Sequence, residues 1–230
     1  MIENTLVVIP ARGGSKGIPK KNIRPLVGKP LILYTTELAR EIFSDNNICV
    51  STDSEEIKQV VEQTGLSIPF IRPDDLASDT ASSRDVLLHA IDYYHTKEQR
   101  KYDRILLLQP TTPFRKPEHV TQVAELFSDG IDMVVSVVVA KANPYYTLFE
   151  ADTEGYLKKS KEGKFARRQD CPTVFQLNGS MYMINVESII RSDMSEFNKV
   201  LPYPMEDLYS IDIDTELDWK FAEVVSQSLK

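Results

Sequence analysis

The sequence is poor in the residues that build metal clusters and disulfide scaffolds. Among its 230 residues there are two cysteines, Cys49 and Cys171, and three histidines, with no C-x-x-C pattern. Neither a zinc site nor a disulfide framework is therefore expected. Long apolar runs are missing too: no stretch approaches the roughly eighteen residues of a membrane-spanning helix, and the apolar run 6–10 is too short for a signal peptide. We expect a cytoplasmic protein with no membrane partner.

Two common nucleotide-binding fingerprints and an excess of positive charge are also absent. The chain contains neither a G-x-G-x-x-G dinucleotide loop nor a G-x-x-x-x-G-K-[ST] phosphate loop. Its 27 Lys and Arg residues against 34 Asp and Glu residues give a net charge of −7, which argues against a nucleic-acid partner. No Ser/His or Cys/His pattern indicates a covalent nucleophile. A local cluster of cations therefore stands out against this acidic background.

Apolar runs of strand length alternate with segments of helical period along most of the chain. Strict alternation of this kind predicts an α/β fold with a doubly wound, mostly parallel sheet and right-handed crossovers. The run 105–109 is almost continuously apolar, which is typical of a central parallel strand. A capping-box pattern starting at Thr52 predicts the beginning of the second helix. Strands are predicted at 5–10, 48–52, 67–72, 105–109, 133–139 and 177–186, and helices at 31–43, 53–63, from 82, at 116–128 and at 217–229.

The regular alternation stops in the segment 140–175, where aromatic residues, glycine and charge are mixed with short alternating stretches. We interpret this segment as a small β-rich excursion from the sheet. Its apolar residues would be poorly covered if it stood alone, so packing on a second subunit is one interpretation. A long surface loop folded onto its own domain is the other, and the sequence leaves both open.

The segment 9–22 contains the most informative pattern of the chain. Three glycines lie within 13–17, and five cationic side chains lie within 12–24. Glycines let backbone amides approach a ligand closely, and fixed cations neutralise clustered negative charge, so the loop suits a triphosphate. A basic surface loop after an edge strand is the alternative. So many cations in an acidic protein favour the triphosphate interpretation.

A second pattern, Asp212 and Asp214 in the sequence I-D-I-D-T, lies near the end of the chain. On an extended segment alternate side chains share a face, so both carboxylates should point together while Ile211 and Ile213 face the core. Adjacent carboxylates repel unless a cation lies between them, and hard oxygen ligands suit Mg²⁺. The alternative is that Asp214 only caps the following helix with the help of Thr215.

Five motifs together resemble the CMP-N-acylneuraminate synthetase family, which includes the CMP-legionaminate and CMP-pseudaminate synthetases. The resemblance spans nearly the whole chain and implies one cytidylyltransferase domain over 1–230 with a nucleotide-diphospho-sugar transferase-like fold. Of the five motifs, the first is specific, and their common order makes coincidence improbable. The motifs are I-P-A-R-G-G-S-K-G-I-P-K-K-N at 9–22, R-P-x-x-L-A-x-D-x-A at 72–81, L-Q-P-T-T-P-F-R at 108–115, Q-x-N-G-S-x-Y at 176–182 and I-D-I-D-T at 211–215.

The resemblance implies transfer of CMP from CTP to the anomeric hydroxyl of a nine-carbon 2-keto-3-deoxy sugar acid, with release of pyrophosphate, by a homodimer. Catalysis is assigned by resemblance to Arg12, Lys21, Asp212 and Asp214, the last two as ligands of Mg²⁺. The nucleotide would be bound by Arg12, Gly14, Ser15, Lys16, Lys21, Asn22, Arg72, Ala81 and Ser82. The sugar acid would be bound by Gln109, Lys141, Arg168, Gln176 and Asn178, some of them across a dimer interface.

Several of these residues have a structural alternative. Ser82 fits a helix cap, Asn178 with Gly179 fits a hairpin turn, and Arg168 fits a solvated surface charge. The main rival function is 3-deoxy-manno-octulosonate cytidylyltransferase, which shares the chemistry with another acceptor. A non-catalytic nucleotide-sugar sensor and a nucleic-acid-binding module rank lower. The sequence does not separate sialic, legionaminic and pseudaminic acids as acceptors.

Overall fold

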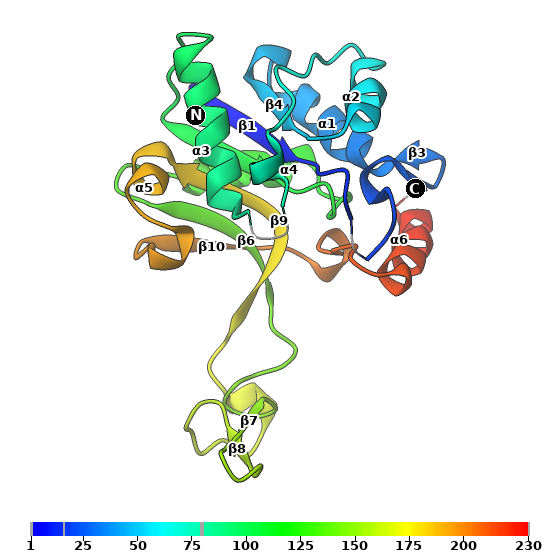
Figure 1. The fold of residues 1–230 in the computed structure, drawn as a ribbon. Helices are drawn as coiled ribbons and strands as arrows, with labels where there is room; N and C mark the ends of the chain where they lie inside the picture. Colours follow the sequence, from blue (N-terminus) through cyan, green and yellow to red (C-terminus); the bar gives the residue numbers. More distant parts are fainter. Residues whose placement is uncertain (1, 16, 79–80, 230) are drawn as a thin grey trace.

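A six-stranded sheet forms the centre of the computed structural model, which describes residues 2–15, 17–78 and 81–229. The strand order is β10-β6-β9-β5-β1-β4, and the neighbouring pairs are parallel except those that involve β9, which runs antiparallel to both β5 and β6. The predicted mostly parallel sheet is confirmed (Figure 1). Its strands are β1 (Thr5–Pro10), β4 (Ile48–Ser51), β5 (Arg104–Leu108), β6 (Met133–Val139), β9 (Phe175–Asn185) and β10 (Val200–Pro204).

Helices cover both faces of this sheet, as a doubly wound fold requires. In β1, Val7 and Ile9 point into one apolar cluster, whereas Leu6 and Val8 point into the other, and all four are fully buried. This alternation follows from the two-residue period of a strand. The first cluster is closed by α1 (Leu31–Ile42), α2 (Glu55–Glu62) and α4 (Pro117–Leu126), the second by α3 (Ser83–Thr96) and α5 (Val186–Arg191).

A third apolar cluster fastens the basic loop to the end of the chain. Ile18 of this loop and Ile213 of the acidic segment are both fully buried and pack with Trp219 of α6. The cluster therefore holds two segments together that are remote in sequence. The elements around it are the two-stranded ribbon of β2 (Pro25–Leu26) and β3 (Lys29–Pro30), and the helix α6 (Glu216–Ser228).

Two details of the predicted secondary structure are wrong. The strand predicted at 67–72 does not form: β4 ends at Ser51, and only Thr52 continues beside this segment, through a single parallel bridge to Ile71. Because Thr52 is held in that bridge, the helix begins later than predicted, and Ser54 is its N-cap, with Oγ accepting from the Ile57 amide at 3.4 Å. The short elements α5 and β10 were not predicted. The 3-10 helices are η1 (Lys21–Ile23), η2 (Asp45–Asn47), η3 (Asp74–Leu76), η4 (Arg168–Asp170), η5 (Met194–Glu196) and η6 (Asp207–Tyr209).

The segment 140–175 leaves the body of the molecule as an extended arm (Figure 1). Its far end carries an antiparallel pair, β7 (Phe149–Ala151) and β8 (Leu157–Lys159), whose residues are all exposed. The excursion predicted for 140–175 is present and carries this one short antiparallel pair, and the arm does not fold back on its own domain. Within the described ranges, none of the helices combines the length and the apolar character needed to cross a lipid bilayer.

Candidate active site

A cavity of about 340 Å³ opens where β1 and β5 end. Pro10 is the last residue of β1, and Gln109 follows β5, so the cavity lies at the carboxyl ends of parallel strands, where open α/β sheets bind ligands. The surrounding loops bring many of the predicted site residues to one place. Those that line the cavity are Arg12, Ser15, Lys21, Asn22, Arg72, Ala81, Ser82 and Gln109.

The basic loop is held in shape by its own residues. Lys21 and Asn22 begin η1 and are both buried, with 8% of their surface exposed. The Asn22 side-chain amide donates to the carbonyl of Arg12 at 3.0 Å, which closes the loop on itself. Lys20 adopts a left-handed backbone with φ of 53°, and this turn sends Lys21 inward. The loop therefore presents Arg12 and Lys21 to the cavity as preset cations.

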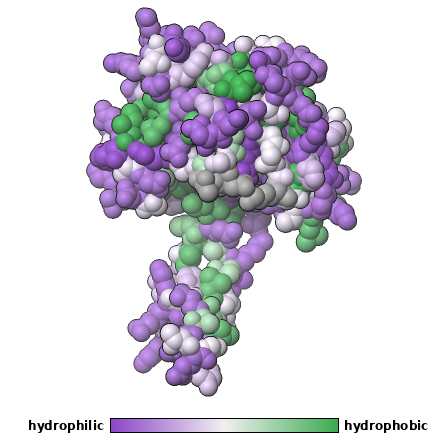
Figure 2. All heavy atoms as spheres, in the orientation of Figure 1, coloured by the Kyte–Doolittle hydropathy of each residue, from purple (hydrophilic) through white to green (hydrophobic). Residues whose placement is uncertain are grey.

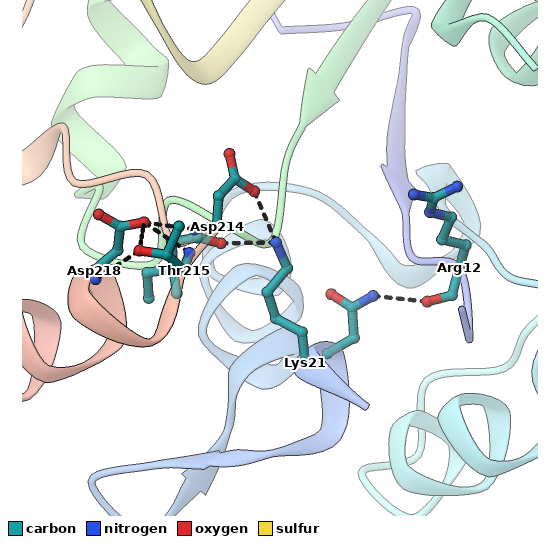
Figure 3. Close-up of polar contacts among 7 residues, drawn as sticks. Arg12, Lys21, Asp214, Thr215 and Asp218 are labelled. Carbon is teal, nitrogen blue, oxygen red and sulfur yellow. Dashed lines mark hydrogen bonds and ion pairs between the residues drawn. The ribbon is translucent and has the colours of Figure 1, made fainter. Parts of the chain in front are cut away.

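Lys21 links the basic loop to the acidic segment. Its ammonium donates to the carbonyl of Ile213 at 2.7 Å and to Asp214 Oδ1 at 2.9 Å (Figure 3). The lysine side chain is 10% exposed, whereas that of Asp214 is 70% exposed. Gly17 permits this approach, because a Cβ atom at its position would lie 2.1 Å from the backbone oxygen of Asp214. The two charged segments highlighted by the sequence are thus in direct contact.

The acidic segment has the predicted alternation. Ile211 and Ile213 are 8% and 0% exposed, while Asp212 and Asp214 face outward. Although Asp212 keeps open surface, the protein around its carboxylate raises its pKa by desolvation, and the negative charge of Asp214 raises this pKa further. A hydrogen bond with Thr111 opposes the rise. The two carboxylates are therefore close enough to repel each other.

Thr215, and not Asp214, caps the last helix. The Thr215 hydroxyl accepts from the Asp218 amide at 3.3 Å, and the Asp218 carboxylate accepts from the Thr215 amide at 2.7 Å. These two contacts form a complete capping box. The alternative in which Asp214 only caps α6 is wrong, and its carboxylate is paired with Lys21 instead.

Asp212 lines a second cavity, of about 620 Å³. Lys141 and Gln176, at the base of the arm, contribute to it, and the Lys141 ammonium lies 2.7 Å from Asp207 Oδ2. A Cβ atom at Gly179 would lie 3.1 Å from Asp212 Oδ2 and 3.5 Å from Gln109 Oε1. Gln109 lines the first cavity and Asp212 the second, so the two cavities adjoin over Gly179.

Among the described residues, four predicted site residues line neither cavity: Gly14, Arg168, Asn178 and Asp214, the last of which is paired with Lys21. Arg168 is exposed in η4 of the arm, and Gly14 has open space beside its Cα. Asn178 is buried inside β9, where its amide contacts protein groups on both sides, so the hairpin alternative for Asn178 and Gly179 is wrong. Lys16 lies outside the described residues. Ser82 lines the first cavity and also caps α3, as the two interpretations of this residue predict. Its Oγ accepts from the Asp85 amide at 3.1 Å.

Arg115 is a buried cation for which the sequence predicts no role. Its Nε donates to Ser180 Oγ at 3.1 Å, and its Nη2 donates to the carbonyl oxygens of Gln109 and Thr112. Desolvation lowers the pKa of Arg115 to about 9, and the charge of Asp212 partly offsets this effect. Arg115 therefore remains positively charged at neutral pH and braces the loop that carries Gln109. Its place at the end of the L-Q-P-T-T-P-F-R motif was the available signal.

The chain has extensive similarity to known proteins. The sequence profile of the cytidylyltransferase family matches residues 6–227. The CMP-N,N'-diacetyllegionaminic acid synthase of Legionella pneumophila is 38% identical over 223 residues, which cover 95% of this chain and 94% of that protein. An N-acylneuraminate cytidylyltransferase of Streptococcus agalactiae is 34% identical over 93% of this chain, which spans about half (51%) of that longer relative.

The fold also has solved neighbours. A CMP:2-keto-3-deoxy-manno-octonic acid synthetase complexed with CTP superposes with a TM-score of 0.73 over 99% of this chain and 100% of its own length. At 18% identity this likeness establishes the fold alone. The match of the family profile to nearly the whole sequence, together with the Legionella relative, establishes more: this chain belongs to the cytidylyltransferase family.

Proposed function

We propose that this protein transfers the CMP group of CTP to the anomeric hydroxyl of a nine-carbon 2-keto-3-deoxy sugar acid and releases pyrophosphate. The contact between Lys21 and Asp214 beside the cavity of Arg12 and Arg72 carries the proposal, because it joins a cationic loop and an acidic segment at one site. The names of the legionaminic acid and N-acylneuraminate relatives support this class of acceptor.

In this proposal the first cavity holds CTP. Arg12 and Lys21 contact its phosphates, and Arg72 contacts the cytosine. The hydroxyl oxygen of the sugar acid forms a bond to the α-phosphorus, and the bond from this phosphorus to the bridging oxygen breaks. Pyrophosphate leaves with the electron pair, and the hydroxyl proton passes to solvent. The cations stabilise the charge that gathers on the leaving group, so no covalent intermediate is required.

The donor set fits Mg²⁺ in this proposal. Asp212 and Asp214 offer hard oxygen atoms. Desolvation, and to a smaller degree the charge of Asp214, raises the pKa of Asp212, so a cation at this place would be favourable. The described part of the chain has no cluster of three or more His, Cys, Asp or Glu side chains suited to a metal. Two carboxylates with substrate phosphates are a common arrangement for Mg²⁺. When bound, the ion would neutralise phosphate charge.

The second cavity is proposed to hold the sugar acid, with Lys141 and Gln176 among its contacts. Because the arm leaves the body, Arg168 reaches neither cavity of its own chain, and we propose that it serves the site of a second copy. Apolar surface along the neck of the arm supports a homodimer (Figure 2). Exposed apolar side chains of the arm and its base include Val139, Leu148, Phe149, Tyr156, Leu157, Phe175 and Leu177. A cytoplasmic location stays a prediction.

One assay tests the proposal against its main rival. Purified protein is incubated with Mg²⁺, with each nucleoside triphosphate in turn, and with N-acetylneuraminate, N,N'-diacetyllegionaminate, pseudaminate or 3-deoxy-manno-octulosonate. Pyrophosphate release and the mass of the product are measured. We expect turnover with CTP and a nine-carbon acid, and turnover lower by about a hundredfold or more with Lys21→Met under the same conditions. Turnover with the eight-carbon acid and with none of the nine-carbon acids would favour the rival. If CTP is turned over with none of the four acids, the proposal is overturned.

A further inference from the structure

Asp53 touches two parts of the first cavity at once. Its Oδ1 atom accepts a hydrogen bond from the Gly13 amide at 2.9 Å and lies 3.5 Å from the Arg72 guanidinium. Arg72 lines the cavity, and Gly13 directly follows Arg12, which lines it as well. Asp53 itself is not among the described residues that line the cavity. It contacts Arg72 and the backbone next to Arg12 from outside the cavity.

The sheet brings these residues together. The Ala11 amide donates to the carbonyl of Ser51 at 2.9 Å, which extends the pairing of β1 with β4 beyond the strands. On the other side, Thr52 bridges Ile71, and its carbonyl accepts from the Arg72 amide at 2.8 Å. Asp53 directly follows Thr52, Arg72 directly follows Ile71, and Gly13 lies two positions after Ala11. Their contact is thus built on main-chain hydrogen bonds and not on flexible side chains alone.

The position of Gly13 depends on close packing against the same turn. A Cβ atom at Gly13 would lie 2.9 Å from the Cβ atom of Ser54, closer than side chains normally approach. The peptide between Arg12 and Gly13 can therefore reach the Asp53 carboxylate only because Gly13 has no side chain. Because of this close approach, the start of the basic loop is hydrogen-bonded to Asp53, the same carboxylate that pairs with Arg72.

Charge makes the contact necessary. Arg72 is only 3% exposed, and desolvation lowers the pKa of its guanidinium. The negative charge of Asp53 raises this pKa, and the positive charge of Arg12 lowers it. Two guanidinium groups thus share one cavity, and they repel each other. Within the described part of the chain, the Asp53 carboxylate is the ion-pair partner of Arg72, and it also holds the backbone beside Arg12. Without it, a nearly buried cation would lack its counter-ion.

We propose that Asp53 is a positioning residue that couples Arg72 to the basic loop, so that the two cations of the cavity are set at a fixed separation before the nucleotide binds. This inference rests on the proposed function, because it takes the cavity as the CTP site. Asp53 acts through Arg72 and Gly13 and does not touch the nucleotide. Its effect should therefore appear in CTP affinity and in discrimination between bases, more than in the chemical step.

The test is Asp53→Asn, which keeps an oxygen for the Gly13 amide and removes the charge that orients Arg72. We expect KM for CTP to rise about tenfold, kcat to change less, and the preference for CTP over UTP to fall. Adding Asp53→Asn to Arg72→Met should change KM little beyond the single Arg72 variant, because residues in one network couple. A merely structural role would lower the melting temperature and kcat and leave KM and base preference unchanged.

Asp45→Asn is the matched control. Asp45 accepts from the Arg40 guanidinium at 2.8 and 3.0 Å, so the same change is made in another arginine–aspartate pair. Neither residue lines the two cavities described above. KM for CTP should therefore stay at the wild-type value in this variant. CTP binding measured by calorimetry without acceptor gives a second readout for both variants, in which only Asp53→Asn should weaken binding.

The outcomes separate the two proposals. Wild-type protein that neither binds nor turns over CTP would refute the proposed function. Wild-type protein that is active, with Asp53→Asn at wild-type KM and base preference, would overturn only the positioning role. If Asp53→Asn does not fold, Asp53→Glu replaces it: the longer side chain keeps the charge but displaces Arg72, so KM for CTP should rise about threefold. An unchanged KM in that variant would also overturn the inference.

Discussion

The Lys21 ammonium lies 2.9 Å from Asp214 Oδ1, although 193 positions separate the two residues in the chain. Lys21 is nearly buried, so its charge needs acceptors, and the Ile213 carbonyl and the Asp214 carboxylate supply them. The same ammonium lines the first cavity. One side chain therefore connects the cavity proposed for CTP with the carboxylates proposed for Mg²⁺, and substitutions at either end should be felt at the other.

Lys21→Met should reduce turnover with CTP by about a hundredfold or more, the usual scale for one preorganised contact to a developing charge. Lys20→Met is the control, because Lys20 is exposed, pairs with Glu56 at 2.7 Å and does not line the first cavity. The measurement is kcat/KM for CTP in both variants. An equal loss in the two would mean that general positive charge, and not the position of Lys21, supports the reaction.

Asp214→Asn should lower turnover by about a hundredfold and shift the Mg²⁺ dependence to higher concentrations, since one hard anionic ligand is lost. Turnover is measured across a Mg²⁺ titration. Asp193→Asn, an exposed aspartate that caps a distant 3-10 helix, serves as the control and should keep the wild-type Mg²⁺ dependence. Full Mg²⁺-dependent turnover in Asp214→Asn would show that the metal assignment is wrong.

Asp212→Asn should make the protein more stable at neutral pH while it lowers activity. The pKa of Asp212 is raised in the folded state by desolvation and by Asp214, so its ionisation opposes folding. This penalty is absent below the unfolded pKa of about 4 and is complete once the pH has risen through the folded pKa. The melting temperature of Asp212→Asn should therefore exceed that of the wild type at pH 7.5, and the difference should vanish below pH of about 4.

Asp193 provides a contrast of opposite sign for the stability measurement. A hydrogen bond from the Ser195 amide, together with one from its hydroxyl, lowers the pKa of Asp193. Its ionised form therefore stabilises the fold above the unfolded pKa, and the stabilisation is lost as the pH falls through the folded pKa. Asp193→Asn should melt lower than the wild type at pH 7.5. If Asp212→Asn and Asp193→Asn shift the melting temperature at pH 7.5 in the same direction, this account is contradicted.

Asn178→Ala should lower the free energy of unfolding by about 2–3 kcal/mol, because it leaves buried groups without partners. The Asn178 oxygen accepts from Ser136 Oγ at 2.6 Å and from the Ser180 amide at 3.1 Å, and its amide nitrogen donates to Ser210 Oγ at 2.9 Å. Urea denaturation measures the loss. Asn198→Ala, at an exposed site, should stay within about 0.5 kcal/mol of the wild type.

A role of Asn178 in acceptor binding, which the family resemblance implies, would have a different signature. Removal of an acceptor contact should raise KM for the sugar acid and leave the denaturation midpoint near the wild-type value. The buried contacts of its amide lead us to expect the loss of stability instead. A raised KM without that loss would contradict the structural role.

Leu157→Asp should weaken the proposed homodimer. Leu157 lies in β8 at the far end of the arm with 70% of its surface exposed, and a charge buried there in an interface is costly. Sedimentation analysis should show a larger monomer fraction than in the wild type. Ile190→Asp, a change of the same kind at a 53% exposed residue of α5, should leave the distribution unchanged. A monomeric wild-type protein would refute the proposed dimer.

The sequence by itself determined the layers of the fold, the basic loop, the outward carboxylates and the family. These features depend on local spacing: the two-residue period of strands, the turn of a helix, and motifs of adjacent residues. The alternation of Ile211 with Asp212 could be predicted because burial of alternate residues follows directly from an extended backbone.

Only the tertiary structure decided which side chains meet. The register of the sheet brings Asp53 beside Arg72, and the third apolar cluster brings Lys21 to Asp214. Partners such as these are set by where whole segments end on the sheet, and no short-range pattern encodes them. The same reason explains the inward Asn178, the bracing role of Arg115 and the arm that leaves the body: each depends on packing between segments that are remote in the chain.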